Sequence, residues 1–241
     1  MMTLPEYAML FVGALIAAAI SGSAGFGGAL LLLPLLVHQV GVTMAVPLLT
    51  VVQLIGNLSR VGFGFRRIHW PSVGWFLALA LPAAVLGALS FVSIPTSWAT
   101  RAIGLLLLVF VALRLTGRPR FTPGRRLLLA GGALTGFLSG LAGSAGPLGA
   151  AVFLSLGLPP VSYVASEATT ALVMHGAKAI VYQQQIALLR PIWLLAALLG
   201  IAMILGTWIS KRWIESLPPQ RFRIFVTLLL TLLAARMLWL G

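Results

Sequence analysis

Three long stretches of the chain carry no charged residue, and they constrain the fold more than any other feature. Residues 7–37, 70–100 and 127–166 contain no Lys, Arg, Asp or Glu. A bilayer core about 30 Å thick is spanned by about 20 apolar helical residues, so each stretch is long enough for one span or more. Only 8% of the 241 residues are charged, against about 25% in a soluble domain. The chain is therefore predicted to be an all-α, polytopic membrane protein.

A glycine-rich motif occurs twice, with an offset of 118 residues. Residues 21–28 read Ser-Gly-Ser-Ala-Gly-Phe-Gly-Gly, and residues 139–146 read Ser-Gly-Leu-Ala-Gly-Ser-Ala-Gly. The same offset pairs Asn57 with His175 and Arg60 with Lys178. Internal repeats of this kind indicate a repeated architecture. We therefore predict two transmembrane repeats, residues 1–117 and 125–241, joined by a basic cytoplasmic linker at 118–124.

Each predicted repeat holds about five apolar segments. They are expected at 5–22, 26–39, 43–64, 71–92 and 97–115 in the first repeat, and at 127–141, 146–158, 160–183, 190–210 and 219–239 in the second. The basic residues gather in loops near 66–69, 114–126 and 211–223, and the positive-inside rule places all three in the cytoplasm. An even number of crossings must then separate Arg126 from Lys211, so the glycine-rich break reverses the chain, either between two crossings or as a short, re-entrant hairpin. The two repeats are thus expected to be inverted, an arrangement typical of secondary transporters.

The glycine-rich motifs are predicted to break helices at membrane depth. Such a break is tolerated only inside protein or beside a water-filled cavity. Glycine permits the required dihedrals, and the helix that follows offers N–H groups and a positive dipole end to an anion. The expected backbone site consists of Ser21, Gly22, Gly25 and Gly28 in the first repeat and of Ser139, Gly143, Ser144 and Gly146 in the second. Close helix packing is the alternative for these glycines, and it is the preferred interpretation for Gly132, Gly136 and Gly140, which recur every four residues.

Polar side chains form a stripe on one helical face within the third segment of each repeat. The stripes comprise Gln53, Asn57 and Arg60 in the first repeat and Glu167, His175 and Lys178 in the second, with Thr170 nearby. Ionisable groups within a span are costly and indicate function, so we expect these side chains to line a shared aqueous path that binds substrate. Arg60 would stand toward the cytoplasmic end and Lys178 toward the outer end, as two cationic vestibules that attract anions. Snorkelling of the charge to the headgroups is the alternative for Arg60.

Glu167 is the only carboxylate within a predicted span. It can carry a coupling proton when burial favours its protonated form, or it can be a structural partner of Lys178 or of an arginine. His175 is a second candidate for proton traffic, because histidine titrates near neutral pH, although a packed, hydrogen-bonded histidine is an equal alternative. The chain has no Asp, no Cys and no HExxH, GxSxG or P-loop motif. We therefore predict no enzyme activity, metal site or cofactor.

The paired motifs resemble those of the TauE/SafE family, also called the sulfite exporter or toluene-sulfonate uptake permease family. The resemblance rests on the two Ser-Gly-x-Ala-Gly-x-x-Gly stretches, the order of the segments and the basic central loop, and it covers nearly the whole chain. It implies a bacterial inner-membrane permease for sulfite, sulfonates or related sulfur oxyanions, in many cases an exporter. Phe26, Ser144 and Ala145 depart from the family's richer glycine runs, and these departures concern the substrate rather than the fold.

The expected function is secondary-active export of small anions, such as sulfite or organosulfonates, by alternating access with proton coupling. No ATP-binding motif is present, so transport must use a gradient. An anion channel and a non-transporting membrane subunit that anchors or assembles a partner complex are the alternatives. The lipid bilayer is the expected environment, a nucleic acid is not an expected partner despite the net charge of +13, and a homodimer is left open.

Overall fold

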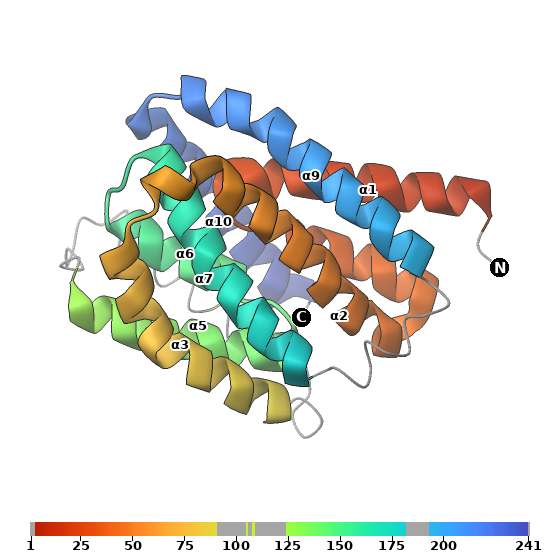
Figure 1. Cartoon of the computed structure of the whole chain (residues 1–241), viewed down its shortest axis with the longest axis horizontal. Helices are drawn as coiled ribbons and strands as arrows, with labels where there is room; N and C mark the ends of the chain where they lie inside the picture. Colours follow the sequence, from red (N-terminus) through yellow and green to blue (C-terminus); the bar gives the residue numbers. More distant parts are fainter. Residues whose placement is uncertain (1–2, 91–104, 106–107, 109–123, 182–192, 241) are drawn as a thin grey trace.

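The computed structural model describes residues 3–90, 105, 108, 124–181 and 193–240, and every regular element in this part of the chain is a helix (Figure 1). The elements are α1 (Leu4–Ala24), α2 (Gly28–Gly64), the 3-10 helix η1 (Phe65–Arg67), α3 (Trp70–Ser90), α5 (Arg125–Ala142), α6 (Gly146–Ser155), α7 (Pro160–Val181), α9 (Trp193–Ser216) and α10 (Pro219–Leu240). The segment expected at 97–115 and the linker expected at 118–124 fall almost wholly outside the described residues.

Four described helical stretches are long and apolar enough to cross a membrane. They are Leu4–Ala24, Met44–Arg67, Trp70–Ser90 and Trp193–Ser216. Large apolar side chains are also exposed on their surfaces, among them Val12, Ile16, Leu86, Leu89, Ile201 and Ile209, as expected for helices that face lipid. The apolar helices Leu31–Gly41 and Gly146–Ser155 are shorter; the 10 residues of α6 extend about 15 Å, half the hydrocarbon thickness. A short apolar helix therefore follows each glycine-rich break.

Local sequence sets where the helices begin and end. The Thr3 N–H donates to Glu6 Oε2 over 2.6 Å, which caps the start of α1. Gly25 and Gly143 end α1 and α5 in the left-handed region, with φ of 86° and 75°, where glycine is the usual C-cap. Gly41 interrupts α2 with φ 74° and ψ 162°, and Figure 1 shows the chain turning back there. Both predicted helix breaks are therefore present, together with a reversal inside α2.

Helices from the two halves of the chain pack against each other in matched pairs. α3 lies along α5, α1 along α9, and α2 along α7. A Cβ on Gly132, Gly136 or Gly140 of α5 would overlap backbone atoms of α3. These three glycines therefore form a packing seam, as predicted. Gly206 plays the same role between α9 and the backbone of α1, so each broken helix is packed closely against a helix of the other half.

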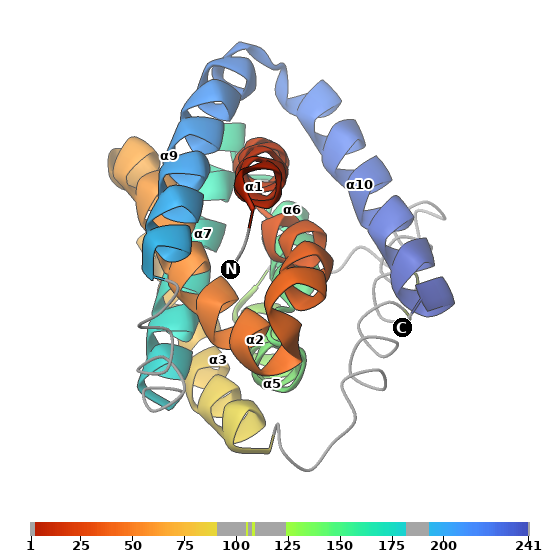
Figure 2. The ribbon, with the colours of Figure 1, turned by 90° about the vertical axis from the view of Figure 1, so that its right-hand side faces the viewer.

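Corresponding helices of the two halves run in opposite directions. In Figure 1, α1 and the second part of α2 run from right to left, whereas α5 and α7 run from left to right. α3 and α9, which follow them in the two halves, are likewise opposed. Figure 2, viewed along the long axis, shows α1 and α6 in the space between α9 and α10.

The basic loops gather at one end of the molecule, here called the basic end. η1, the beginning of α5 and the α9–α10 junction all lie at the left in Figure 1. The guanidinium of Arg125 stacks 3.7 Å from the ring centroid of Trp75, near the start of α3. The His69 N–H donates to Ser166 Oγ over 2.8 Å, which ties the start of α3 to α7. The common end agrees with a single cytoplasmic side for these loops.

Candidate anion site at the two helix breaks

Arg60 binds the end of the first broken helix. Its Nη1 donates to the carbonyl oxygens of Gly25 and Ser21, at 2.6 and 3.3 Å. The last carbonyls of a helix have no partner within the helix, and the negative end of the helix dipole favours a cation. Arg60 reaches these carbonyls from the second part of α2, and Gly25 N–H closes the last turn onto Ser21 O over 2.8 Å.

Lys178 makes the matching contacts at the second broken helix. Its Nζ donates to Gly143 O over 2.8 Å, to Ser139 Oγ over 3.0 Å and to Ser139 O over 3.4 Å. In both halves the cation lies 39 and 35 residues after its two backbone acceptors. The offset of 118 residues therefore pairs equivalent hydrogen bonds in the two halves as well as equivalent residues.

The two breaks meet inside the protein. A Cβ built on Gly146 would lie 3.6 Å from Cβ of Phe26. Phe26 stands just before α2, and Gly146 is the first residue of α6. The N-terminal ends of two short helices therefore converge, and each contributes a positive dipole end to the same region.

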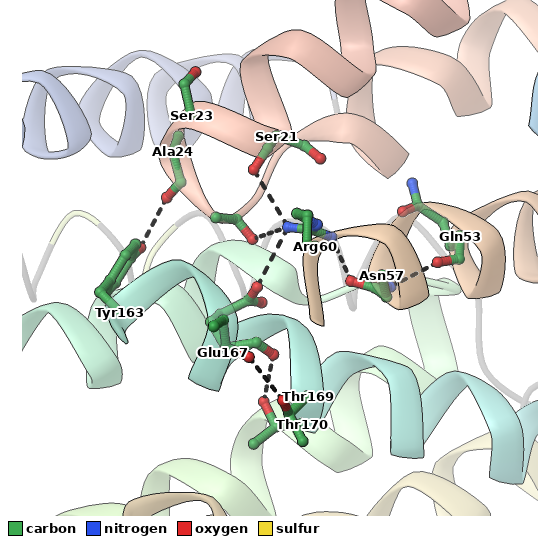
Figure 3. Close-up of polar contacts among 12 residues, drawn as sticks. Ser21, Ser23, Ala24, Gln53, Asn57, Arg60, Tyr163, Glu167, Thr169 and Thr170 are labelled. Atoms are coloured by element: carbon green, nitrogen blue, oxygen red, sulfur yellow. Dashed lines mark hydrogen bonds and ion pairs between the residues drawn. The ribbon is translucent and has the colours of Figure 1, made fainter. Parts of the chain in front are cut away.

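Arg60 is also the centre of a buried polar network (Figure 3). Its Nη1 lies 3.5 Å from Glu167 Oε2, and its Nη2 donates to Asn57 Oδ1. The Asn57 Nδ2 group donates to the carbonyl oxygen of Gln53 over 2.8 Å. Of the partners considered for Glu167, the structure places an arginine beside it.

The buried charges do not balance in the part of the chain that the structure describes. Arg60 faces one carboxylate, whereas no described carboxylate lies within 4.0 Å of Lys178. Lys178 is 0% exposed and is surrounded by neutral oxygen atoms. Two buried cations and one buried carboxylate sum to a formal charge of +1, which faces the negative dipole ends of α1 and α5, and a buried charge without a counterion is costly.

Tyr163 is a site residue that the sequence analysis missed. Its hydroxyl donates to the Ala24 carbonyl over 2.9 Å, and its ring packs edge-on against Phe222 at 5.4 Å between centroids. A Cβ on Gly25 would lie only 2.9 Å from the Tyr163 ring. Tyr163 therefore ties α7 to the end of α1. The only sequence signal was a tyrosine in an apolar segment, which does not reveal its partner.

The predicted polar site residues are all buried. They are Ser21, Gln53, Asn57, Arg60, Ser139, Ser144, Glu167, Thr170, His175 and Lys178. Arg60 and Lys178, expected to stand in two cationic vestibules, are only 5% and 0% exposed and are held by helix-end carbonyls.

For three predicted site residues, the contacts in the structure are ordinary packing or a hydrogen bond within the same helix. A Cβ on Gly22 would collide with the Ser210 side chain of α9, and one on Gly28 would lie 3.0 Å from Ser21. The Thr170 hydroxyl donates to the Glu167 carbonyl over 2.8 Å, within α7.

Six buried side-chain atoms have no hydrogen-bond partner within the described residues. They are Ser21 Oγ, Gln53 Nε2, Arg60 Nε, Thr135 Oγ1, Glu167 Oε2 and His175 Nδ1. Buried polar atoms are nearly always bonded, so bound water or a polar ligand would satisfy these atoms. No group of three His, Cys, Asp or Glu suited to a metal ion occurs among the described residues.

Comparison with known proteins identifies the family. A family model described as sulfite exporter TauE/SafE matches residues 10–237. No curated protein and no solved structure gives a significant match. The family match covers nearly the whole chain, including both breaks and all the helices that carry the buried cations. The chain therefore belongs to the TauE/SafE family and is a multi-pass membrane transporter, not an enzyme.

Proposed function

We propose that the chain exports a small sulfur oxyanion, such as sulfite or an organosulfonate, as a secondary-active carrier. The observation that carries this proposal is the charge at the helix breaks. Two buried cations bind the last carbonyls of α1 and α5 at the two breaks, and one carboxylate lies beside Arg60. An anion bound between the breaks, where the N-terminal ends of α2 and α6 approach each other, would offset the net positive charge. The family match supports the same class of substrate.

We further propose that residues 1–117 and 125–241 are inverted repeats that move by alternating access. The repeated 118-residue offset, the matching hydrogen bonds and the opposed helix directions support this arrangement. Broken helices of inverted repeats commonly form the substrate site near the bilayer midplane. The basic end would face the cytoplasm, and the resemblance to the TauE/SafE family supports the inner membrane of a bacterium as the location.

A carrier agrees with the structure better than an open channel. The cleft lined by Arg60 is small, with a volume of about 30 Å³. A conformational change is then needed before an oxyanion can pass. Glu167 and His175 are the proposed carriers of a coupling proton. Each has a buried side-chain atom without a hydrogen bond among the described residues, and that atom of Glu167 is ion-paired with Arg60.

Gln53 offers a direct test of anion binding. Its Nε2 is a buried donor without a described partner, so Gln53→Leu should leave the fold as stable as before or more stable. If the amide binds the anion, its loss should weaken sulfite binding roughly tenfold to hundredfold, the value of one hydrogen bond to a charged group. Thr50→Val is the matched control, because the Thr50 hydroxyl already donates to Val46 O over 3.0 Å within the same helix.

The measurement is sulfite efflux from proteoliposomes containing purified protein, with and without an inward proton gradient. Saturable efflux that Gln53→Leu weakens and Thr50→Val preserves would support the proposal, and acceleration by the gradient would support proton coupling. Absence of sulfite or sulfonate flux in the wild-type protein would refute it. Conductance far above carrier turnover would indicate a channel, and a stoichiometric co-purifying protein without flux would indicate an assembly subunit.

A further inference from the structure

Two neighbouring cavities with shared wall residues lie between the basic end and Arg60. The outer cavity has a volume of about 710 Å³ and is lined by Arg66 and Arg67 of η1 and by the start of α7. The inner cleft, about 30 Å³, is lined by Arg60 and Lys211. Both cavities have Phe63, Gly64, Val161 and Ile214 in their walls, so they adjoin along one apolar constriction.

Cationic side chains stand at each level of this path. Arg66 and Arg67 are exposed in the outer cavity. Lys211 lies at the constriction, with its Nζ 5.2 Å from the centroid of the Phe63 ring. Arg60 lies at the inner end, and it is within reach of the first helix break. A row of like charges in a narrow cavity with apolar walls focuses its field and attracts anions.

Phe63 is the aromatic residue in the wall that the two cavities share. Phe63 packs edge-on against Trp208 of α9 at 5.6 Å between centroids, and Val161 and Ile214 complete the apolar wall. Glu215 forms an exposed i,i+4 ion pair with Lys211 at 3.9 Å, a contact that is weak in water. An arriving anion could therefore compete with Glu215 for Lys211.

We propose that the outer cavity is the entrance for the transported anion from the basic end, that Phe63, Val161 and Ile214 form its gate, and that Lys211 draws the anion through the gate to Arg60. This inference rests on the proposed anion transport, and it adds the route, the side of entry and the residue that selects for negative charge. Arg212 provides a matched control for Lys211. It is the next residue, is exposed and lines neither cavity.

Chemical labelling tests the route without measuring transport. The chain has no cysteine, so Ser162→Cys introduces a single thiol in the outer cavity. Its reaction rates with an anionic and a cationic methanethiosulfonate of similar size are compared with the same ratio for a free thiol in solution. We expect the anionic reagent to react about fivefold faster and the cationic reagent about fivefold slower than with the free thiol, the effect of one unit charge at contact distance in water on each reagent. Lys211→Gln should reduce this preference, with Arg66 and Arg67 accounting for the remainder, and Arg212→Gln should leave it unchanged.

Transport provides the second readout. Lys211→Gln should raise the sulfite concentration that gives half-maximal efflux by about fivefold, while Arg212→Gln should leave it unchanged. A labelling ratio equal to that of the free thiol, or equal effects of the two substitutions, would overturn the inference while wild-type efflux still stands. Wild-type protein that moves no anion would instead refute the proposed function, whatever the labelling shows.

Discussion

The ion pair between Arg60 and Glu167 gives the sharpest prediction for stability. Glu167→Gln keeps the shape of the side chain but removes the carboxylate that lies 3.5 Å from Arg60 Nη1. Both side chains are 4% exposed, so water cannot replace the lost charge. Arg60 keeps its bonds to Ser21 O, Gly25 O and Asn57 Oδ1, which limit the damage but do not supply a negative charge.

The size of the effect follows from distance and burial. Two unit charges 3.5 Å apart attract by about 5 kcal/mol at an effective dielectric constant near 20. Breaking a buried pair by removing one partner typically costs about 3–5 kcal/mol. Since three neutral acceptors remain around the guanidinium, we expect the free energy of unfolding to fall by about 3 kcal/mol.

Glu215→Gln is the matched control for this prediction. Glu215 is also paired with a cation, Lys211, at 3.9 Å, but the two side chains are 50% and 39% exposed. Exposed i,i+4 pairs contribute about 0.3–0.5 kcal/mol. Thermal unfolding of both variants in detergent micelles measures the difference. A midpoint for Glu167→Gln as close to wild type as that of Glu215→Gln would show that Glu167 carries no negative charge at rest, and the reasoning from the ion pair would fail.

Three further predictions concern the helix breaks and the packing seam, and each is checked by the unfolding midpoint in detergent. Gly136→Ala should destabilise the protein by about 1–3 kcal/mol, because its Cβ would overlap the α3 backbone. Gly176→Ala is the control: its Cβ has open space, so the change should be neutral or stabilising by up to about 1 kcal/mol. Equal effects of the two substitutions would contradict the packing seam. Tyr163→Phe should cost about 1–3 kcal/mol by leaving the last carbonyl of α1 without the hydroxyl that now donates to it, and an unchanged midpoint would count against this tie. Gly25→Ala and Gly143→Ala should each cost about 1–2 kcal/mol for a left-handed alanine. Gly25→Ala should cost more, because its Cβ meets the Tyr163 ring at 2.9 Å while that of Gly143 has 3.7 Å to its nearest neighbour, and the reverse order would contradict the packing around the first break.

The helix breaks could be predicted from sequence because their cause is local. Glycine is the residue that adopts the left-handed conformation without strain, and Gly25 and Gly143 do so at the ends of α1 and α5. The spacing of apolar segments likewise follows from the thickness of the bilayer, which is why the expected segments match the described helices closely. The reversal at Gly41 was expected only as a gap between two segments, since one glycine in an apolar stretch does not specify a turn.

The partners of the buried cations could not be predicted, because those partners are backbone atoms. Sequence spacing indicated that Arg60 and Lys178 occupy equivalent positions. Every residue has a backbone carbonyl, however, and the sequence does not show which carbonyls lack a hydrogen-bond donor. Polar residues in a span suggested a hydrated path. The structure shows a different use for these residues: the last carbonyls of a broken helix lie where there is no water, so they need hydrogen-bond donors from the protein. The same principle accounts for Tyr163, whose acceptor is also a carbonyl at the end of α1.

The double role of the buried cations determines which substitutions can report on transport. Arg60 and Lys178 satisfy carbonyls that would otherwise be unpaired in the membrane interior, so replacing either one damages the helix end before it affects any bound anion. Loss of transport in such a variant therefore identifies substrate binding only when its unfolding midpoint is unchanged. Gln53 and Lys211 are free of this ambiguity, because Gln53 Nε2 has no described partner and the Lys211 side chain is 39% exposed. Substitutions that leave the helix ends intact are for this reason the ones that can separate the transport mechanism from the architecture that supports it.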